Sequence, residues 1–481
     1  KSKSVGDSEN LIIQGDNLEA LKALLPHYQN KIKCIYIDPP YNTGNEGWVY
    51  NDNVDSSIIK KWLGKVVGGE DEDLSRHDKW LCMMYPRLKL LQRFLKSDGI
   101  ITVSIDDNEL NNLGILLDDL FGSENRLACA PWLAEPSGGK EKTGLRNGHE
   151  YIYIYHNGTS ENISKETRST GELNRKDKWG KYRKGRELMK WGGTSLKKDR
   201  PGQWYSLLTP DGTEVWPIKN NGEEGHWRWG KLQKMKQIIQ DPEYAHWEKT
   251  SFDDGITWKG LHERWIPYEK IRDVKRSVGW TTWLDSHGFN ADATRELKEI
   301  FGEKPFDTPK PMSLIKWIIS LHSDDDALVL DSFAGSGTTG HAVMELNKDG
   351  GNRRYILCQI DEPIDPVKKK EAYDFCITNN LQPVISSITI ERLKRAGEKI
   401  AKDLEAENGK SGMFEEDKKQ VPDIGFKVFD SVEAPKLKID ETGRISITEN
   451  KTDALSRIYN MIFTVGLDEP SQVPEMVLEN C

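Results

Sequence analysis

Four consecutive residues could do chemistry on an amine: Asp38, Pro39, Pro40 and Tyr41. They follow the apolar residues 34–37, which predict a buried strand that ends at the aspartate. The prolines lack N–H donors and fix φ, so they stiffen the loop and leave its carbonyls free to accept hydrogen bonds. The Asp38 carboxylate and the Pro39 carbonyl could each accept one N–H of an exocyclic amine on a heteroaromatic ring, on which Tyr41 could stack. A plain turn is the alternative, because Asp-Pro commonly begins turns.

The loop at residues 332–340 has the composition of a nucleotide-binding turn. It follows the apolar residues 327–331, which predict a strand, and a helix is expected from residue 341. Its three glycines are Gly335, Gly337 and Gly340. Glycine permits positive φ and close approach of a ligand, and the N–H groups of a helix start favour a carboxylate or phosphate. The next predicted strand, residues 354–361, ends in an acid, Asp361, that could hold ribose hydroxyls. We expect a nucleoside cofactor site here, with glycines that merely allow close packing as the alternative.

The glycine loop leaves a second class of enzyme open. Its glycines fit the G-x-G-x-x-G pattern of dinucleotide-binding proteins, with Asp361 at a plausible distance, so an NAD-dependent oxidoreductase is an alternative hypothesis. That hypothesis leaves residues 38–41 unexplained. A P-loop is excluded because no lysine follows the last glycine. The sequence contains no compact set of His and Cys ligands, so we expect no metal.

The order of the two motifs resembles one enzyme family. Residues 38–41, followed much later by residues 333–339, resemble the amino-group DNA methyltransferases of the β class, in which the catalytic half precedes the S-adenosylmethionine half. Residues 15–21, 38–44 and 388–392 are similar to the modification subunit of type III restriction-modification systems. The resemblance implies an α/β fold with a Rossmann-like methyltransferase sheet in permuted order, an inserted target-recognition domain and a small C-terminal α+β segment.

The resemblance and the composition predict four segments. They are a catalytic half at residues 1–155, a target-recognition insertion at 156–301, a cofactor-binding half at 302–405 and a C-terminal segment at 406–481. The last segment, with a helix expected at 453–463, is predicted to mediate dimerisation or to dock a partner. A self-packed terminal subdomain is the alternative.

The resemblance also assigns roles to individual residues. Asp38, Pro39 and the loop with Pro40 would bind the target amine, and Tyr41 would stack on the flipped base. The cofactor-binding residues that it implies are Asp16, Lys310, Pro311, Asp331, Phe333, Gly335, Ser336, Gly337, Thr338 and Asp361. Asp16 would lie near the cofactor adenine, although an acid after a strand is often only a helix N-cap. Lys310 would border the methionine moiety, with a solvated loop lysine as the alternative.

The implied reaction is direct methyl transfer from S-adenosylmethionine to adenine N6 in duplex DNA, after the base is flipped out of the helix. Asp at position 38 favours adenine, because enzymes that act on cytosine N4 more often carry Ser there. A cytosine-N4 enzyme, an orphan adenine methyltransferase and a catalytically idle DNA-binding subunit are the alternatives.

The predicted insertion differs from both halves in composition. It holds most of the tryptophans, and its first part is basic. The residues that we expect to contact DNA are Lys181, Arg183, Lys184, Arg186, Lys197 and Lys198. Basic residues interleaved with aromatics fit phosphate and stacking contacts. The alternative is a small domain with a tryptophan core and a solvated lysine face.

Composition limits the remaining possibilities. The 481 residues allow two or three domains, and a formal net charge of −9 requires a localised basic face for DNA binding. Six scattered cysteines fit free thiols in a reducing cytosol, and no membrane segment is apparent, so we expect a bacterial-type cytoplasmic protein. The expected partners are double-stranded DNA, a second copy of the chain and, by resemblance, an ATP-dependent restriction subunit.

Overall fold

The computed structural model describes residues 3–5, 8–43, 74–139, 144–158, 163–169, 171–209, 211–230, 244–322, 324–409, 418–431, 437–439 and 445–447. The chain divides into two compact units. Unit 1 comprises Lys1–Ser164 and Thr281–Cys481, and unit 2 comprises Lys165–Trp280. Unit 2 is thus shorter at both ends than the predicted insertion at 156–301. At the later end, the last helix of that range packs in unit 1.

Unit 1 is built on a nine-stranded sheet. In spatial order its strands are β1 (Lys3–Val5), β17 (Phe426–Asp430), β2 (Leu11–Gln14), β16 (Arg354–Gln359), β15 (Leu328–Asp331), β3 (Ile32–Ile37), β4 (Leu95–Ile105), β6 (His149–His156) and β5 (Arg126–Leu133). Neighbours from β17 to β4 pair in parallel, whereas β1, β6 and β5 pair antiparallel. The fold is therefore α/β with a mixed central sheet.

Helices cover both faces of this sheet, which explains the continuous apolar runs of its central strands. Every residue of β3 is buried. Ile35 and Ile37 join a core cluster with residues of α1 (Asn17–Tyr28), α3 (Leu74–Phe94) and α4 (Leu110–Phe121). Successive strand residues face opposite sides of a sheet, so the alternate positions need a second helical layer.

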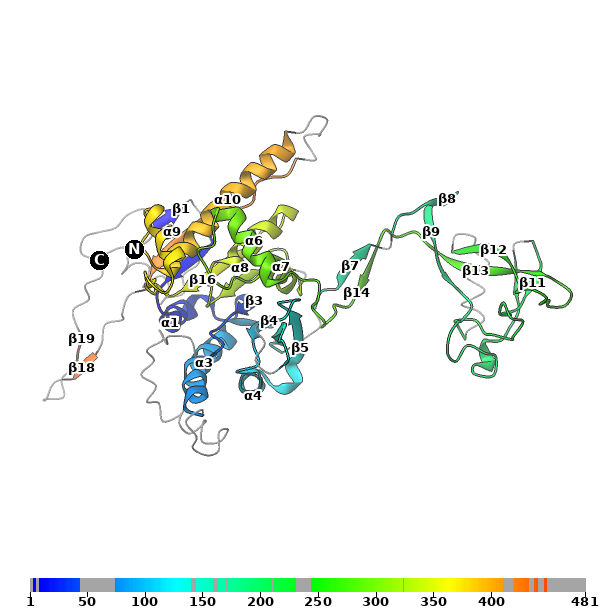
Figure 1. Cartoon of the computed structure of the whole chain (residues 1–481), viewed down its shortest axis with the longest axis horizontal. Coiled ribbons are helices and arrows are strands. Elements are labelled where there is room, and N and C mark those ends of the chain that lie inside the picture. Colours follow the sequence, from blue (N-terminus) through cyan, green and yellow to red (C-terminus); the bar gives the residue numbers. More distant parts are fainter. Residues whose placement is uncertain are drawn as a thin grey trace. The chain divides into compact units, whose positions relative to one another are not determined.

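That second layer comes from the later helices. They are α6 (Asn290–Phe301), α7 (Met312–Ile319), α8 (Thr338–Leu346), α9 (Lys370–Thr378) and α10 (Ile385–Asn408). A Cβ placed on Gly340 of α8 would lie 3.1 Å from a methyl group of Leu357 on β16, so α8 packs closely on the sheet. Figure 1 shows α6, α8 and α10 on the side of the sheet opposite α1, α3 and α4. Short 3₁₀ helices lie at Ser123–Asn125, Pro201–Gln203 and Asn347–Asp349.

The predicted C-terminal segment at 406–481 does not begin as a separate subdomain. Its first strand, β17, joins the central sheet beside β2, with Val428 opposite Ile12. Phe426 and Val428 are buried, and this burial explains why β17 docks there. Strands β18 (Leu437–Ile439) and β19 (Ile445–Ile447) form a two-stranded sheet, and the helix expected at 453–463 lies outside the described residues.

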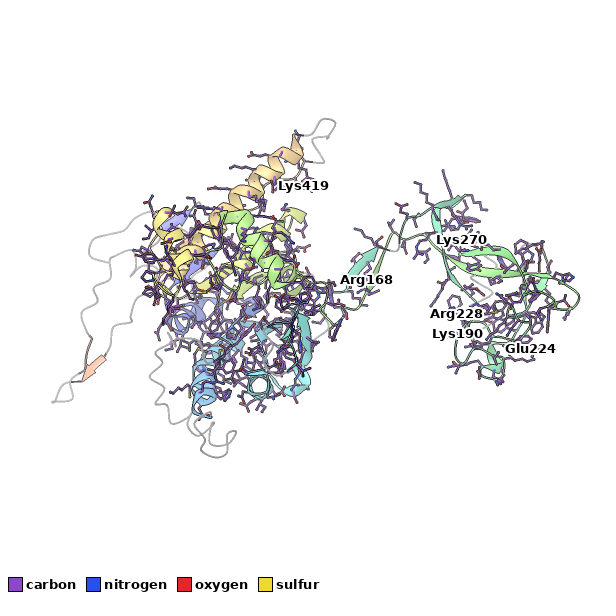
Figure 2. All side chains as sticks on the ribbon, viewed as in Figure 1. Arg168, Lys190, Glu224, Arg228, Lys270 and Lys419 are labelled. Atoms are coloured by element: carbon purple, nitrogen blue, oxygen red, sulfur yellow. The ribbon has the colours of Figure 1, made fainter. Side chains whose placement is uncertain are left out.

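The described part of unit 2 is built from strands. A four-stranded sheet contains β12 (Ala245–Ser251), β13 (Glu263–Ile271), β9 (Gly180–Glu187) and β8 (Arg175–Asp177). Two-stranded sheets pair β7 (Glu166–Ser169) with β14 (Lys275–Val278) and β10 (Leu207–Leu208) with β11 (Glu214–Val215). Its core includes Trp227, against which Trp229 and Trp265 pack. Figure 2 labels Lys190 and Arg228, which come from two segments that backbone hydrogen bonds hold side by side.

Candidate active site

The two loops singled out in the sequence lie at the same edge of the sheet. Asp38 follows β3 and Asp331 ends β15, and these strands pair in parallel with Leu330 beside Ile35. From β3 the chain continues to β4 on one side, and from β15 it continues to β16 on the other. Ligands of open α/β sheets bind where the strand order reverses in this way. A cavity of about 550 Å³ lies at this point.

Most of the predicted site residues line this cavity. They are Asp38, Pro39, Pro40, Tyr41, Lys310, Asp331, Phe333, Gly335, Ser336 and Thr338. The sequence did not single out several other lining residues, among them Glu150, Asn290, Phe306, Gln359 and Lys369. Four of the predicted cofactor-binding residues do not line it: Asp16, Pro311, Gly337 and Asp361.

Helix α3 and a turn hold the amine-binding loop in place. The indole nitrogen of Trp80 donates to the Pro40 carbonyl at 2.6 Å. Asn42 adopts a left-handed φ of 58° and donates its side-chain amide to the buried Glu109. Among the described residues, no side chain or backbone group donates to the Pro39 carbonyl. The Pro40 carbonyl therefore anchors the loop to α3.

Four charged and polar side chains meet beside that loop. Lys310 Nζ donates to Asp38 Oδ2 at 2.9 Å and to Tyr41 Oη at 2.8 Å, and it lies 3.3 Å from Glu150 Oε2. Tyr41 Oη lies 2.8 Å from Asp38 Oδ1 and 2.9 Å from Glu150 Oε2. Lys310 is buried, so it is not the solvated loop lysine considered from the sequence.

The charges in this cluster set the protonation of its members. Burial would lower the pKa of Lys310, but the neighbouring carboxylates of Asp38 and Glu150 outweigh it and raise that pKa. Burial, together with the same two carboxylates, raises the pKa of Tyr41 well above its usual value. The cluster thus holds a protonated lysine and a protonated tyrosine.

Glu150 is the member that sequence analysis missed. It belongs to β6, which runs antiparallel to β4, so the beginning of β6 lies at the edge where β3 and β15 end. The alternating tyrosines and isoleucines of residues 151–155 predict a strand but not its direction, and the direction decides which end of the strand reaches the cavity. An acid directly before an aromatic strand was the only available signal.

The glycine loop begins helix α8. Gly335 and Gly337 have φ of 53° and 85°, and a Cβ on Gly337 would lie 3.1 Å from the methyl group of Thr389. Gly337 is therefore required for backbone shape rather than for lining the cavity. Behind the loop, the fully buried Arg392 donates from Nη1 to Ser336 Oγ and Thr338 Oγ1, both at 2.7 Å. Both oxygens accept from a cation and lie 3.4 Å apart, so at most one hydroxyl donates to the other and at least one hydroxyl hydrogen can be donated elsewhere.

Asp331 fixes the start of the same loop. Its carboxylate accepts from the Phe333 N–H at 2.9 Å and from the Thr339 hydroxyl. Burial raises the pKa of Asp331 to about 7, despite these hydrogen bonds. The residue shapes the loop, and its charge is costly in this environment.

Two predicted cofactor acids have other positions. Asp16 Oδ1 accepts from the backbone N–H of Leu18 at 2.8 Å and caps α1, as the alternative interpretation required. Asp361 is exposed because β16 ends two residues earlier, at Gln359. Gln359 lines the cavity, and its side-chain oxygen accepts from the Gly335 N–H at 2.7 Å. At the end of β16, Gln359 rather than Asp361 therefore borders the cavity. Pro311, which also lies outside the cavity lining, is the N-cap of α7.

The predicted DNA-binding residues differ in how they are paired within unit 2. Three are in ion pairs: Lys184 with Glu248 at 2.7 Å, Arg186 with Glu269 at 3.0 Å and Lys197 with Glu224 at 2.8 Å. Lys181 and Lys198 are exposed, and Arg183 is half-buried.

No helix within the described ranges has the length and apolarity needed to cross a membrane. No group of three or more His, Cys, Asp or Glu side chains in those ranges could hold a metal ion.

A comparison with solved structures gives low overall similarity. A putative DNA modification methylase from Thermus thermophilus, solved in complex with S-adenosyl-L-methionine, aligns with 88% of this chain and 100% of its own. Its sequence identity is 11% and its TM-score 0.35. That TM-score is too low to establish a shared fold.

Comparison of sequences is more informative. The chain is 34% identical over 405 residues to the type III restriction-modification enzyme EcoPI Mod subunit of Escherichia phage P1, which covers 76% of this chain and 59% of that protein. It is 33% identical over 392 residues to the type II methyltransferase M.KpnI of Klebsiella pneumoniae, covering 79% and 85%. The chain thus spans about three fifths of the length of the EcoPI subunit. A model of the N6 and N4 DNA methylases matches residues 32–365, which include both motif loops, and the chain therefore belongs to this DNA methylase family.

Proposed function

We propose that this protein transfers the methyl group of S-adenosylmethionine to adenine N6 in duplex DNA. The proposal rests on one observation above all. The Asp38 loop and the Asp331 glycine loop, far apart in sequence, border a single cavity at the switch point of the sheet. An amine held by the first loop would therefore face a cofactor held by the second.

The residues of the second loop fit the proposed cofactor. The Ser336 and Thr338 hydroxyls and the N–H groups at the start of α8 can donate to a carboxylate, which the amino-acid end of S-adenosylmethionine carries. Gln359 is the candidate partner for the ribose hydroxyls, in place of Asp361. Phe333 and Phe306 supply apolar walls to the same cavity. When bound, the cofactor supplies a methyl group on a sulfonium, which is a good electrophile.

The residues of the first loop would position and polarise the amine. Asp38 and the Pro39 carbonyl accept its two N–H groups, which turns the nitrogen lone pair toward the methyl group. The N–C bond forms as the C–S bond breaks, and the extra proton leaves the nitrogen for water or a carboxylate. Catalysis then consists mostly of orientation and electrostatic stabilisation. A base in a duplex cannot reach this cavity, so flipping is required.

We favour adenine over cytosine because Asp stands at position 38. The basic residues of unit 2, above all the exposed Lys181 and Lys198, are the proposed phosphate contacts. The similarity to type III Mod subunits supports a role as a modification subunit that forms a homodimer and pairs with an ATP-dependent restriction subunit. The similarity to M.KpnI keeps a stand-alone methyltransferase as the second candidate.

The first test is transfer of a labelled methyl group to mixed-sequence duplex DNA, with mass spectrometry of the nucleosides. We expect N6-methyladenine from the wild type. Its formation should fall by at least about a hundred-fold in Asp38→Ala, because the polarising acceptor is lost. Asp403→Asn, an exposed change on α10, is the matched control and should retain activity. N4-methylcytosine as the product would instead establish the cytosine alternative.

Light scattering of the purified chain tests the proposed assembly. A mass of twice 54.9 kDa supports the homodimer. Full site-specific methylation by a monomer, without any added subunit, would favour the stand-alone enzyme.

A further inference from the structure

Lys310 contacts three side chains that line the cavity, and one of them, Asp38, is also the proposed acceptor of the target amine. An ammonium carries three N–H bonds. Those of Lys310 have three acceptors within reach: Asp38 Oδ2, Tyr41 Oη and Glu150 Oε2. Without a ligand, the lysine therefore occupies the site of the incoming amine on Asp38.

The Tyr41 hydroxyl is shared in the same way. It lies within hydrogen-bond distance of both Asp38 and Glu150, yet it has one hydrogen to donate. When that hydrogen is donated to Glu150, Asp38 Oδ1 is free. Glu150 is thus a second acceptor for each of the two donors that occupy Asp38.

We propose that Glu150 is a positioning residue that holds Lys310 and Tyr41 while the target amine takes their place on Asp38. This inference rests on the function proposed above. It also extends that proposal to a residue on β6 that belongs to neither motif.

Glu150 contributes to the charge of the site as well. Methyl transfer moves positive charge from the sulfonium to the amine nitrogen. Asp38 and Glu150 with Lys310 carry a formal charge of minus one, which favours that developing cation, whereas Asp38 and Lys310 alone are neutral. Side-chain exposure is 23% for Asp38, 18% for Glu150 and 9% for Lys310, so water screens these charges only partly.

The test compares Glu150→Gln with Glu150→Asp and with Glu19→Gln, an exposed control on α1. Gln keeps the size and one oxygen acceptor but removes the charge. We expect kcat of Glu150→Gln to fall roughly ten- to a hundred-fold, while KM for DNA and the Kd for S-adenosylmethionine change less than about three-fold. Glu150→Asp should recover part of the loss in kcat, and the control should not differ from the wild type.

A second readout does not depend on methyl transfer. The rate at which a small anhydride acetylates Lys310 is followed against pH by peptide mass spectrometry. The charged and titratable groups that face Lys310 are Asp38, Glu150 and Tyr41, and losing one carboxylate should shift the labelling curve to lower pH. An unshifted curve together with a kcat within two-fold of the wild type would overturn the proposal. If the wild type methylated no DNA, the proposed function would fail, yet a shifted curve would still support the contact between Glu150 and Lys310.

Discussion

The cavity of unit 1 and the basic strands of unit 2 use charge in opposite ways. In unit 1, Asp331, Lys310 and Arg392 are buried, and each is bound by several fixed partners. In unit 2, Lys184 and Lys197 lie at the surface, each paired with one glutamate. Buried charges are costly unless their geometry is fixed, whereas surface ion pairs contribute little and exchange readily. Fixed, buried charges are suited to orienting reacting groups. Surface ion pairs are suited to binding a charged partner, because they can exchange one ion for another.

The largest expected effect compares the loss of stability when a buried or a partly exposed arginine of helix α10 is replaced. Arg392→Met should lower the free energy of unfolding by on the order of 3 kcal/mol, because the Ser336 and Thr338 hydroxyls lose a charged donor and Glu296 loses a nearby cation. Arg395→Met is the control on the same helix. It breaks a partly exposed pair with Glu391 and a hydrogen bond to Asn379 at 2.6 Å, and it should cost less than Arg392→Met because Arg395 is not fully buried. Urea denaturation measures the free energy of unfolding of both variants. Equal losses would contradict the predicted difference between the buried and the partly exposed arginine.

The second prediction concerns the pH dependence of stability. The pKa of Asp331 is about 7 in the folded protein, above its usual value, so the folded state binds more protons than the unfolded state between those two values. Stability should therefore fall as pH rises through that window and level off above pH 7. Asp331→Asn should flatten the curve and be more stable at pH 8 by on the order of 2 kcal/mol.

Unfolding titrations from pH 5 to pH 8 would measure this difference. If the stability of the wild type rose with pH over this range, and Asp331→Asn showed the same slope, a raised pKa of Asp331 could not be the cause of the pH dependence.

The third prediction separates the two candidates for the cofactor ribose. Gln359→Ala should weaken S-adenosylmethionine binding by about ten-fold, because it removes a polar group from the cavity and the acceptor of the Gly335 N–H. Asp361→Ala, at an exposed position outside the cavity lining, should change affinity less than two-fold. Isothermal titration calorimetry decides between them, and the reverse ranking would restore the original assignment of Asp361.

The smallest expected effect lies in unit 2. Lys181→Gln or Lys198→Gln should weaken duplex binding a few-fold and reduce the salt slope by about 1, as expected for one lost phosphate contact. Lys184→Gln and Lys197→Gln should do less, because each lysine must first give up its glutamate. Fluorescence anisotropy at several salt concentrations measures all four. Equal slopes for the paired and unpaired lysines would show that the ion pairs do not limit DNA contact.

The elements around the motifs were largely predictable because their signals are local. Residues 100–105 are mostly apolar and predict a strand, which is the end of β4, and residues 313–320 form an amphipathic run that nearly coincides with α7. The boundaries between the two units were harder to predict from the sequence. The high tryptophan content indicated where the insertion lies. Helix α6, at the end of the predicted insertion, nevertheless packs with Phe375 and Ile388 of unit 1, and no local sequence pattern reveals this contact.

The sequence by itself determined the two loops and predicted their chemistry, since both inferences depend on the types and order of residues 38–41 and 332–340. It also allowed Asp16 to be an N-cap, which it is, because N-capping depends on the residue and its neighbours. Only the tertiary structure decided that β3 and β15 are adjacent, that Gln359 lines the cavity while Asp361 does not, and that Glu150 joins Asp38 and Lys310. These facts depend on strand pairing and strand direction between distant segments, and periodicity along one segment contains no information about either.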